Sequence, residues 1–170
     1  MTKIHKPSEF ISINIALLTI SDTRIIENDK SGNLLQERIT SFGHNLKERN
    51  IIKDDFEIIK QTFVNLSNDP LIDAIISTGG TGLTGRDSTP EVVTKLSDKM
   101  IDGFGELFRQ ISFNKIGTST IQSRAIGAII NGTYVWSTSN ISNQPNESHV
   151  TYAQQCPTNE SQVVVLVNPQ

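Results

Sequence analysis

The chain has 170 residues, of which 19% are charged and 36% hydrophobic, and its formal net charge at pH 7 is -3. This length and composition predict one globular domain with a buried core. The acidic balance gives no electrostatic reason to expect a nucleic acid or an anionic membrane as a partner. The single cysteine, Cys156, excludes an internal disulfide and a thiolate cluster. The apolar stretch 15–20 is too short for a signal peptide or a membrane helix, so we expect a cytoplasmic protein.

The N-terminal part of the chain indicates an arm, a strand and a helix. Residues 1–12 are expected to form a loose N-terminal arm. The nearly continuous apolar run 14–20 predicts a strand, and it ends in polar residues that include Asp22. Asp29 then offers an N-cap to a helix that Gly43 would end. For Asp22 and Asp29, turn or cap chemistry and contact with a ligand both stay open as interpretations.

A second strand and a second helix follow. Residues 46–52 have a weak strand pattern whose charged centre indicates a sheet edge. Asp54 and Asp55 precede a helical apolar pattern over 58–66. A carboxylate there is usually an N-cap worth about 1 kcal/mol, but Asp54 would also lie at the mouth of the sheet. The apolar run 74–76 completes a β-α-β-α-β order, which predicts a parallel sheet with helices on its faces.

The segment after this third strand has the strongest signal for a site. Its sequence, Thr78-Gly79-Gly80-Thr81-Gly82, has three glycines in four positions, which permits positive φ and close approach of backbone to a ligand. Arg86 and Asp87 follow, and residues 88–90 indicate the start of a helix. A glycine loop between a strand and a helix N-terminus is how α/β proteins bind anions at the carboxyl edge of a sheet.

The segment from Gly80 to Gly85 has the spacing of two known glycine motifs but the context of neither. A dinucleotide-binding fingerprint needs the helix to open within the motif, whereas the helix signals come after Gly85. A P-loop needs Lys followed by Ser or Thr where Arg86 and Asp87 stand. We therefore assign the loop to neither class.

The next part of the chain predicts two helices and an antiparallel hairpin. One helix follows Pro90, and a second follows the glycines of segment 103–105. Asn131-Gly132 separates two apolar runs, 125–130 and 133–136, which is a strong hairpin signal. The sheet is therefore expected to contain an antiparallel pair of strands.

The last part of the chain, 137–170, has a different character. Residues 137–162 are nearly all polar and have no helical or strand period, which indicates loop or disorder. The run Val163 to Val167 either adds a short strand, by pairing with a sheet edge, or forms an aggregation-prone tail.

Several segments together resemble the MoaB/Mog family of molybdenum cofactor biosynthesis, most closely its MoaB branch. The segments are TISDTR (19–24), DKSGN (29–33), STGGTGLTGRDSTPE (77–91), GFGELFRQISF (103–113) and IGTSTIQSRAIGAIINGT (116–133). They agree with the family in order and spacing, which is more specific than the glycine loop alone.

The resemblance implies a three-layer α/β/α fold over residues 13–136, with a mostly parallel sheet plus an antiparallel hairpin. It also implies a homotrimer or homohexamer with a site for molybdopterin. In the Mog branch that site adenylylates the terminal phosphate of the pterin with MgATP. Mg²⁺ and ATP are therefore the expected cofactors, and a molybdopterin adenylyltransferase is the expected class of enzyme.

The resemblance also carries site residues over to this chain. The loop Thr78 to Gly82 would hold phosphate through its backbone amides, Asp87 would serve Mg²⁺ and the transfer, and Asp54 would be a second functional aspartate. Carboxylate oxygens suit a hard cation, and phosphoryl-type transfer needs positioning and charge neutralisation rather than a protein nucleophile. Further residues that fall in blocks lining the family's pocket are Asp22, Ser112 and Ser119.

The chain departs from the family after Trp136. Family members continue with a loop like Leu-Pro-Gly-Ser/Asn-Pro and then a C-terminal helix, and residues 137–170 have neither pattern. A changed reading frame near codon 136 and genuine divergence would both produce this. The C-terminal helix is therefore expected to be missing. Three interpretations follow: a MoaB-like enzyme, a non-catalytic pterin-binding oligomer, and a structural or regulatory domain.

Overall fold

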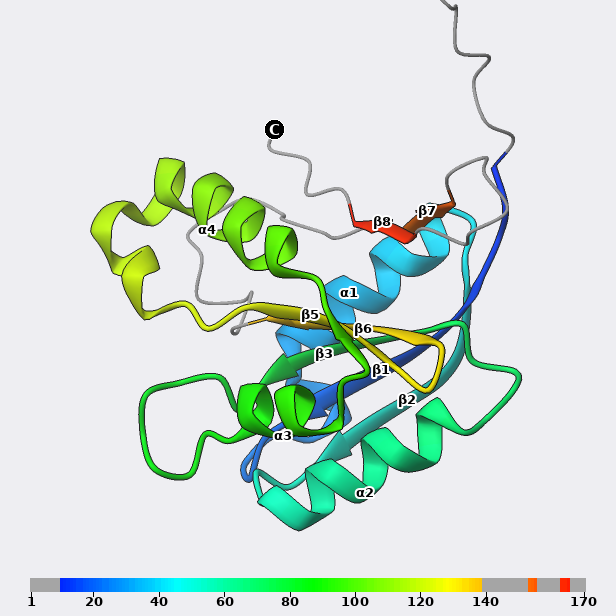
Figure 1. Cartoon of the computed structure of the whole chain (residues 1–170), viewed down its shortest axis with the longest axis horizontal. Coiled ribbons are helices and arrows are strands. Elements are labelled where there is room, and N and C mark those ends of the chain that lie inside the picture. Colours follow the sequence, from blue (N-terminus) through cyan, green and yellow to red (C-terminus); the bar gives the residue numbers. More distant parts are fainter. Residues whose placement is uncertain (1–9, 139–152, 156–162, 166–170) are drawn as a thin grey trace, which may run out of the picture.

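The computed structural model describes residues 10–138, 153–155 and 163–165, and its main elements form three layers (Figure 1). The middle layer is a six-stranded sheet with the strand order β2-β1-β3-β6-β5-β4. The strands are β1 (Asn14–Ile20), β2 (Asn45–Ile52), β3 (Ala74–Gly79), β4 (Lys99–Met100), β5 (Ile126–Ile130), β6 (Thr133–Thr138), β7 (Ala153–Gln155) and β8 (Val163–Val165). The α-helices are α1 (Lys30–Ser41), α2 (Phe56–Ser67), α3 (Thr89–Leu96) and α4 (Asp102–Ile116), and the 3-10 helices are η1 (Ile26–Asn28) and η2 (Gly117–Gln122).

The sheet is mostly parallel, as predicted. Strand β1 pairs in parallel with β2 and β3, and β3 pairs in parallel with β6. The hairpin at Asn131 and Gly132 joins β5 to β6, and positive φ angles of 48° and 80° at these two residues account for the Asn-Gly sequence. Strand β4 was not predicted, because two residues carry no readable period, and it pairs with β5 in the antiparallel sense.

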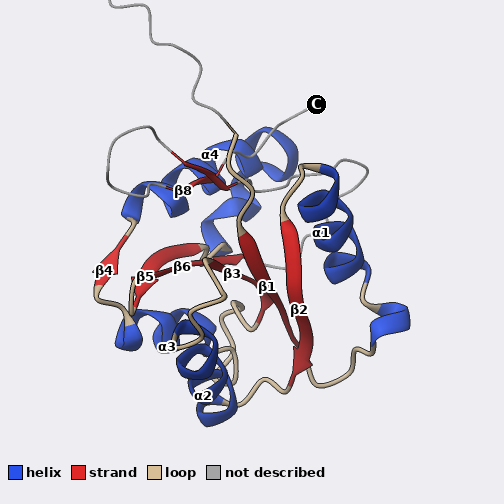
Figure 2. Ribbon diagram, turned by 90° about the vertical axis from the view of Figure 1, so that its right-hand side faces the viewer, coloured by secondary structure: helices blue, strands red, loops and turns tan. Residues whose placement is uncertain are grey.

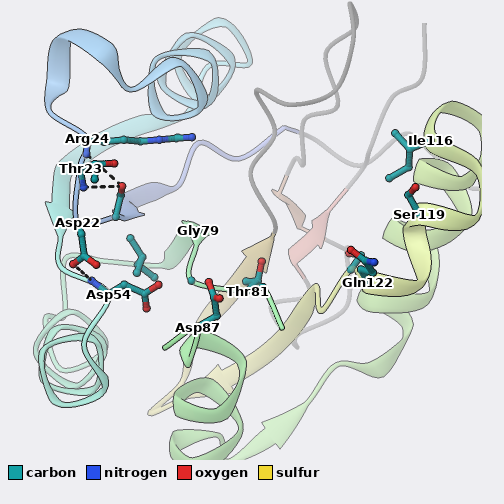
Figure 3. A pocket seen from close by; sticks show the side chains of 15 residues that line it. Asp22, Thr23, Arg24, Asp54, Gly79, Thr81, Asp87, Ile116, Ser119 and Gln122 are labelled. Atoms are coloured by element: carbon teal, nitrogen blue, oxygen red, sulfur yellow. Dashed lines mark hydrogen bonds between the residues drawn. The ribbon is translucent and has the colours of Figure 1, made fainter. Parts of the chain in front are cut away.

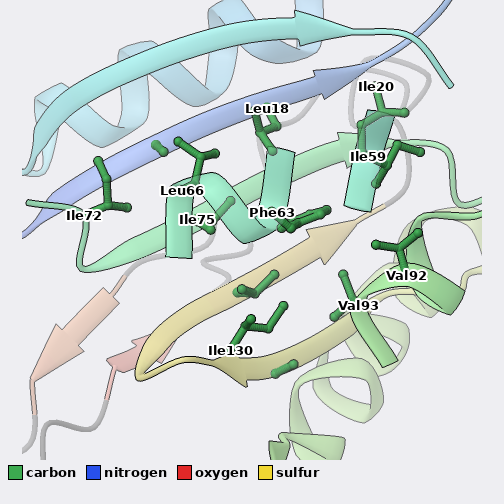
Figure 4. Packing of buried hydrophobic residues seen from close by; sticks show 13 residues of the cluster. Leu18, Ile20, Ile59, Phe63, Leu66, Ile72, Ile75, Val92, Val93 and Ile130 are labelled. Atoms are coloured by element: carbon green, nitrogen blue, oxygen red, sulfur yellow. The ribbon is translucent and has the colours of Figure 1, made fainter. Parts of the chain in front are cut away.

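Apolar side chains alternate between the two faces of the sheet and give each face its own core. On one face, Ile15 and Leu17 of β1 pack in a cluster with residues of α1 and α4. On the other face, Ala16 and Leu18 pack with residues of α2 and α3 (Figure 4). Figure 1 accordingly shows α1 and α4 on one side of the sheet and α2 and α3 on the other. This confirms the three-layer α/β/α fold.

Helices α1 and α2 begin at capping residues that the sequence indicates, whereas α4 begins at Asp102, ahead of the glycines of segment 103–105, and has no side-chain cap. Asp29 caps α1 by accepting from the backbone N–H of Gly32, and Asp55 caps α2 by accepting from two backbone N–H groups. Helix α3 begins at Thr89 and has Pro90 in its first turn, as expected of proline. Gly43, with a φ of 84°, follows the end of α1. Because α1, α2 and α3 follow β1, β2 and β3 along the chain, these helix starts lie at the carboxyl edge of the parallel strands. Figure 2 shows these helices packed around the sheet.

The two ends of the chain are described only in part. Residue Ser12 of the expected arm donates to the carbonyl of Gly43 at 2.7 Å, while residues 1–9 lie outside the described residues. Strand β6 continues to Thr138, two residues past Trp136. Strand β8 lies in the final apolar run, and it pairs with β7 in a separate two-stranded sheet rather than with an edge of the main sheet. Strand β7 was not expected, because the polar composition of residues 137–162 predicted loop or disorder there. The expected loss of the C-terminal helix concerns residues that lie outside the described ones.

Candidate functional site

A cavity of about 600 Å³ lies at the carboxyl ends of β1 and β3, where the strands meet the loop after β2 and the helix η2 (Figure 3). Parallel α/β folds bind ligands at this edge, because strand ends and helix N-termini meet there. The residues that line the cavity are Ile20, Ser21, Asp22, Thr23, Arg24, Asp54, Gly79, Gly80, Thr81, Gly82, Asp87, Ile116, Ser119, Gln122 and Ser123.

The glycine loop forms the floor of the cavity and needs its glycines at two positions. Gly79 and Gly80 have φ angles of 99° and 62°, which L side chains rarely adopt. A Cβ atom on Gly79 would lie 2.2 Å from the carbonyl oxygen of Ile20, and one on Gly80 would lie 2.3 Å from Oγ1 of Thr89. The backbone of the loop is therefore packed against β1 on one side and against α3 on the other.

Arg124 holds the conformation of this loop through hydrogen bonds to its carbonyl groups. Its Nε donates to the carbonyl of Thr81 at 3.1 Å, and its Nη2 donates to the carbonyls of Gly82 and Asp87. Its Nη1 pairs with Glu91 at the start of α3. One guanidinium group thus ties together both ends of the loop segment 82–87 and engages carbonyl oxygens that would repel an anion. The sequence did not single out this residue, since its partners lie about 40 positions away.

Three aspartates line the cavity in very different environments. Asp22 accepts from the backbone N–H of Asp54 at 3.3 Å and pairs with Arg86. Asp87 accepts from the backbone N–H and the hydroxyl of Thr84. Oδ1 of Asp54 is buried and has no hydrogen-bond partner among the described residues. Burial raises the pKa of Asp54 above its ordinary value, and the charges of Asp87 and Asp22 raise it further against the opposing charge of Arg86.

The carboxylates of the cavity do not form a complete magnesium site by themselves, but they fit a site in which phosphate oxygens and water supply the remaining ligands. Within the described ranges, no group of three or more His, Cys, Asp or Glu side chains is arranged to hold a metal ion, so an all-protein metal cage is not formed there. Mg²⁺ in nucleotide sites takes one or two carboxylates and completes its coordination with phosphate oxygens and water. The unpartnered oxygen of Asp54, which lies 3.2 Å from where a Cβ on Gly80 would stand, fits this second mode.

The structure separates Asp29 from the cavity. Its side chain is fully buried and accepts from Oγ1 of Thr19 at 2.6 Å, from Arg24 at 3.2 Å and from Arg49 at 3.1 Å, besides its cap bond. Burial alone would raise the pKa of Asp29, but hydrogen bonds from Thr19, Gly32 and Arg49 outweigh it, and the pKa lies below its ordinary value. Asp29 is therefore a helix-capping residue rather than a ligand contact. It is not among the residues that line the cavity.

Most of the expected site residues come together at the cavity. Asp22, Asp54, Asp87, Ser119 and the glycines 79, 80 and 82 line it, as does Thr81. Thr78 is buried in β3 and is not part of the lining. Ser112 is buried within α4, where its hydroxyl donates to the carbonyl of Phe108 at 2.7 Å. Arg24, Gln122 and Ser123 also line the cavity; they fall in the family-like segments 19–24 and 116–133 but were not assigned to the site from the sequence.

The fold and the cavity define an α/β domain with a candidate ligand-binding site at the carboxyl edge of its sheet. Residues 16–151 match a family described as the probable molybdopterin binding domain, and this span is well over half of the chain. The chain belongs to this family. The match ends at residue 151, beyond Trp136, where the family motifs were expected to stop.

Individual relatives agree with this assignment. Molybdenum cofactor biosynthesis protein B of Bacillus cereus is 45% identical over 134 residues, which cover 78% of this chain and 79% of that protein. The protein of the same name from Escherichia coli K12 is 40% identical over 130 residues, or 76% of each chain.

Solved structures show the same fold. A crystal structure of Molybdenum cofactor biosynthesis protein B superposes with a TM-score of 0.76 at 43% identity and covers 79% of this chain and 84% of that one. The tungsten cofactor synthesizing protein MoaB from Pyrococcus furiosus gives a TM-score of 0.67 at 32% identity, over 78% of this chain and 85% of that one. No helix within the described parts of the chain is both long enough and apolar enough to cross a membrane.

Proposed function

We propose that this chain acts in molybdenum cofactor biosynthesis, and that it binds molybdopterin in the cavity and transfers AMP to the pterin's terminal phosphate from MgATP. The names of the relatives support the process, and the family description supports the pterin as ligand. The environment of Asp54 supports the transfer step.

The single observation that carries the transfer step is the unpartnered Oδ1 of Asp54 beside the glycine loop. Leaving a buried carboxylate oxygen without a donor destabilises the folded protein by about 1–3 kcal/mol. Such a cost is typical of functional sites, where a ligand supplies the missing partner. In our proposal that partner is Mg²⁺ bound to nucleotide phosphates, with Asp87 as a second carboxylate.

The chemistry requires little more than positioning and charge neutralisation. A terminal phosphate oxygen of the pterin attacks the α-phosphorus of ATP, a new P–O bond forms, and the bond to the departing pyrophosphate breaks. Bound Mg²⁺ would neutralise phosphate charge. The backbone of Gly79 to Gly82 lines the cavity, and its N–H groups would bind the phosphates. Arg124 keeps the neighbouring carbonyl groups engaged.

The test is transfer of AMP from α-labelled ATP to molybdopterin by the purified chain. Asp87→Asn keeps an oxygen that can accept from Thr84, so it should keep its melting temperature. It should lose transfer by about 100-fold or more at saturating MgATP, because the negative charge that would hold a cation is gone. Asp55→Asn is the matched control, since Asp55 caps α2 and is not part of the cavity lining. Full transfer activity in Asp87→Asn would show that Asp87 only shapes its loop through Thr84.

A second candidate function is binding of the pterin without turnover. It is favoured by the lack of a ready three-carboxylate cluster among the described residues and by the engagement of Asp22 with Arg86. The same assay separates the two functions: molybdopterin binding measured by calorimetry, with no labelled product, would establish the second.

We also propose that the chain forms a homo-oligomer, a trimer or a hexamer. Helices α4 and η2 expose apolar side chains, with Phe113 at 55% and Ile121 at 82% of their full accessibility. Exposed apolar side chains that gather on one part of a surface indicate contact with another protein. Light scattering coupled to gel filtration should give a mass three or six times that of the 18.8 kDa chain. A monomer at micromolar concentration would refute this.

A further inference from the structure

The charges that line the cavity are unbalanced. Three acidic residues line it, Asp22, Asp54 and Asp87, and one basic residue, Arg24. Arg24 is the only Lys or Arg among the lining residues, while Arg86 on the loop above is paired with Asp22. An anionic ligand that enters this cavity therefore meets repulsion at the aspartates and attraction at Arg24.

Arg24 is held in place but keeps most of its hydrogen-bonding capacity. Its Nη1 donates to Oδ1 of Asp29 at 3.2 Å, and its backbone N–H donates to Oγ of Ser21 at 3.3 Å. A guanidinium group has five N–H donors, and no other bond of this one is found within the described residues. The side chain is 21% exposed. Figure 3 shows Arg24 beside Thr23, with Asp22 and then Asp54 further along the same side and Asp87 farther away.

The carboxylate that anchors Arg24 does not cancel its charge. Asp29 is shared with Arg49, so the cluster contains two guanidinium groups and one carboxylate, a formal net charge of +1. Arg49 is not part of the cavity lining and bonds instead to Gln36 at 2.8 Å. The positive charge that remains is therefore presented to the cavity through Arg24.

We infer that Arg24 is an anion-binding residue of the cavity, which donates hydrogen bonds to phosphate oxygens of the ligand at a position apart from Asp54 and Asp87. The phosphorylated nature of the ligand rests on the proposed function. A planar guanidinium group held by a buried carboxylate is suited to bidentate contact with phosphate. The cavity then has two phosphate-binding positions, one that needs a cation beside Asp54 and Asp87 and one that needs none.

The test uses inorganic pyrophosphate as the probe, titrated by calorimetry into the full chain in the presence of EDTA. Removal of divalent cations leaves Arg24 as the main source of affinity. Arg24→Gln should weaken pyrophosphate binding by about 10-fold or more, the range expected for charge-assisted hydrogen bonds. Arg24→Lys, which keeps the charge and loses the planar fork, should give an intermediate affinity.

Arg49→Gln is the matched control. Both substitutions remove one guanidinium partner from Asp29, but only Arg24 lines the cavity. Arg49→Gln should therefore bind pyrophosphate within about twofold of the wild type. An equal loss of affinity in the two variants would overturn the inference, since the effect would then come from the shared Asp29.

The outcome is separable from that of the proposed function, because pyrophosphate binding requires no turnover. Selective loss of binding in Arg24→Gln supports the inference even if the chain transfers no AMP. A wild-type chain that transfers AMP while Arg24→Gln and Arg24→Lys bind pyrophosphate normally would retain the proposed function and overturn the role of Arg24. A wild-type chain that binds no pyrophosphate without divalent cations would overturn it as well.

Discussion

Asp29 and Asp54 follow neighbouring parallel strands and lie near the start of a helix, yet their surroundings are opposite. Asp29 is fully buried and accepts from a hydroxyl, a backbone amide and two guanidinium groups. Asp54 has a buried oxygen without a partner and two like charges nearby. The pKa of Asp29 is lowered and that of Asp54 is raised. The first carboxylate stabilises the fold, whereas the second destabilises it in a way that a bound cation would relieve.

The largest effect should come from breaking the satisfied carboxylate. Asp29→Ala leaves Arg24 and Arg49 without their shared partner, and loss of one member of a buried charge cluster costs about 3–5 kcal/mol. Urea denaturation at neutral pH measures this. Asp55→Ala is the control, because it removes an exposed N-cap and should cost only about 1 kcal/mol. Equal losses in the two variants would mean that burial of the Asp29 cluster adds nothing to its role as a cap.

A smaller effect of opposite sign is expected at the unsatisfied carboxylate. Asp54→Asn removes a charge that Asp87 and Asp22 oppose, so the variant should gain about 0.5–2 kcal/mol in free energy of unfolding while AMP transfer is lost. The exposed Glu37 on α1 provides the control: Glu37→Gln should change stability by less than about 0.5 kcal/mol. A less stable Asp54→Asn would mean that the carboxylate is satisfied in the free protein.

The last prediction concerns how the stability gained by Asp54→Asn depends on pH. The folded-state pKa of Asp54 is above its ordinary value of 3.8, so the ionised group costs stability at neutral pH, and the cost disappears once the pH falls below that ordinary value. The advantage of Asp54→Asn should therefore shrink towards zero at about pH 3. Asp29 has a lowered pKa, and its stabilising contribution is lost as the pH falls below 3.8 through its folded pKa. Both proteins contain Asp29, so that loss cancels, and a gain that does not change with pH would exclude Asp54 as its source.

The elements that were predicted correctly are those with local signals. Apolar runs and caps within a dozen residues indicated β1, α1, β2, α2 and β3, and the Asn-Gly pair indicated the hairpin. The glycine loop was visible for the same reason, since several glycines within one short segment mark a backbone that approaches its surroundings closely. The structure adds that Gly80 also packs against Thr89, so a side chain at Gly80 would disturb the fold as well as ligand binding.

What the sequence could not reveal depends on contacts between distant segments. Arg124 reaches carbonyl groups 37 to 43 positions away, and Arg24 joins Arg49 through Asp29. Nothing in the sequence around Arg24 or Arg124 indicates which distant groups these side chains contact, so neither residue was assigned to the site. Ser112 illustrates the converse, because its place in a family-like block says nothing about whether it faces the cavity or, as found, the carbonyl of Phe108.

The two outer strands of the main sheet have a consequence for how copies of this chain can associate. Strand β2 ends the sheet on one side and carries Lys47, Glu48 and Arg49, while β4 ends it on the other side with only two residues, Lys99 and Met100. Charged or very short edge strands are poor templates for a further strand. Growth of one continuous sheet from chain to chain is therefore disfavoured, and we expect contacts between copies to be made by helices and loops. The same two edges should also keep partly folded copies from joining into fibres.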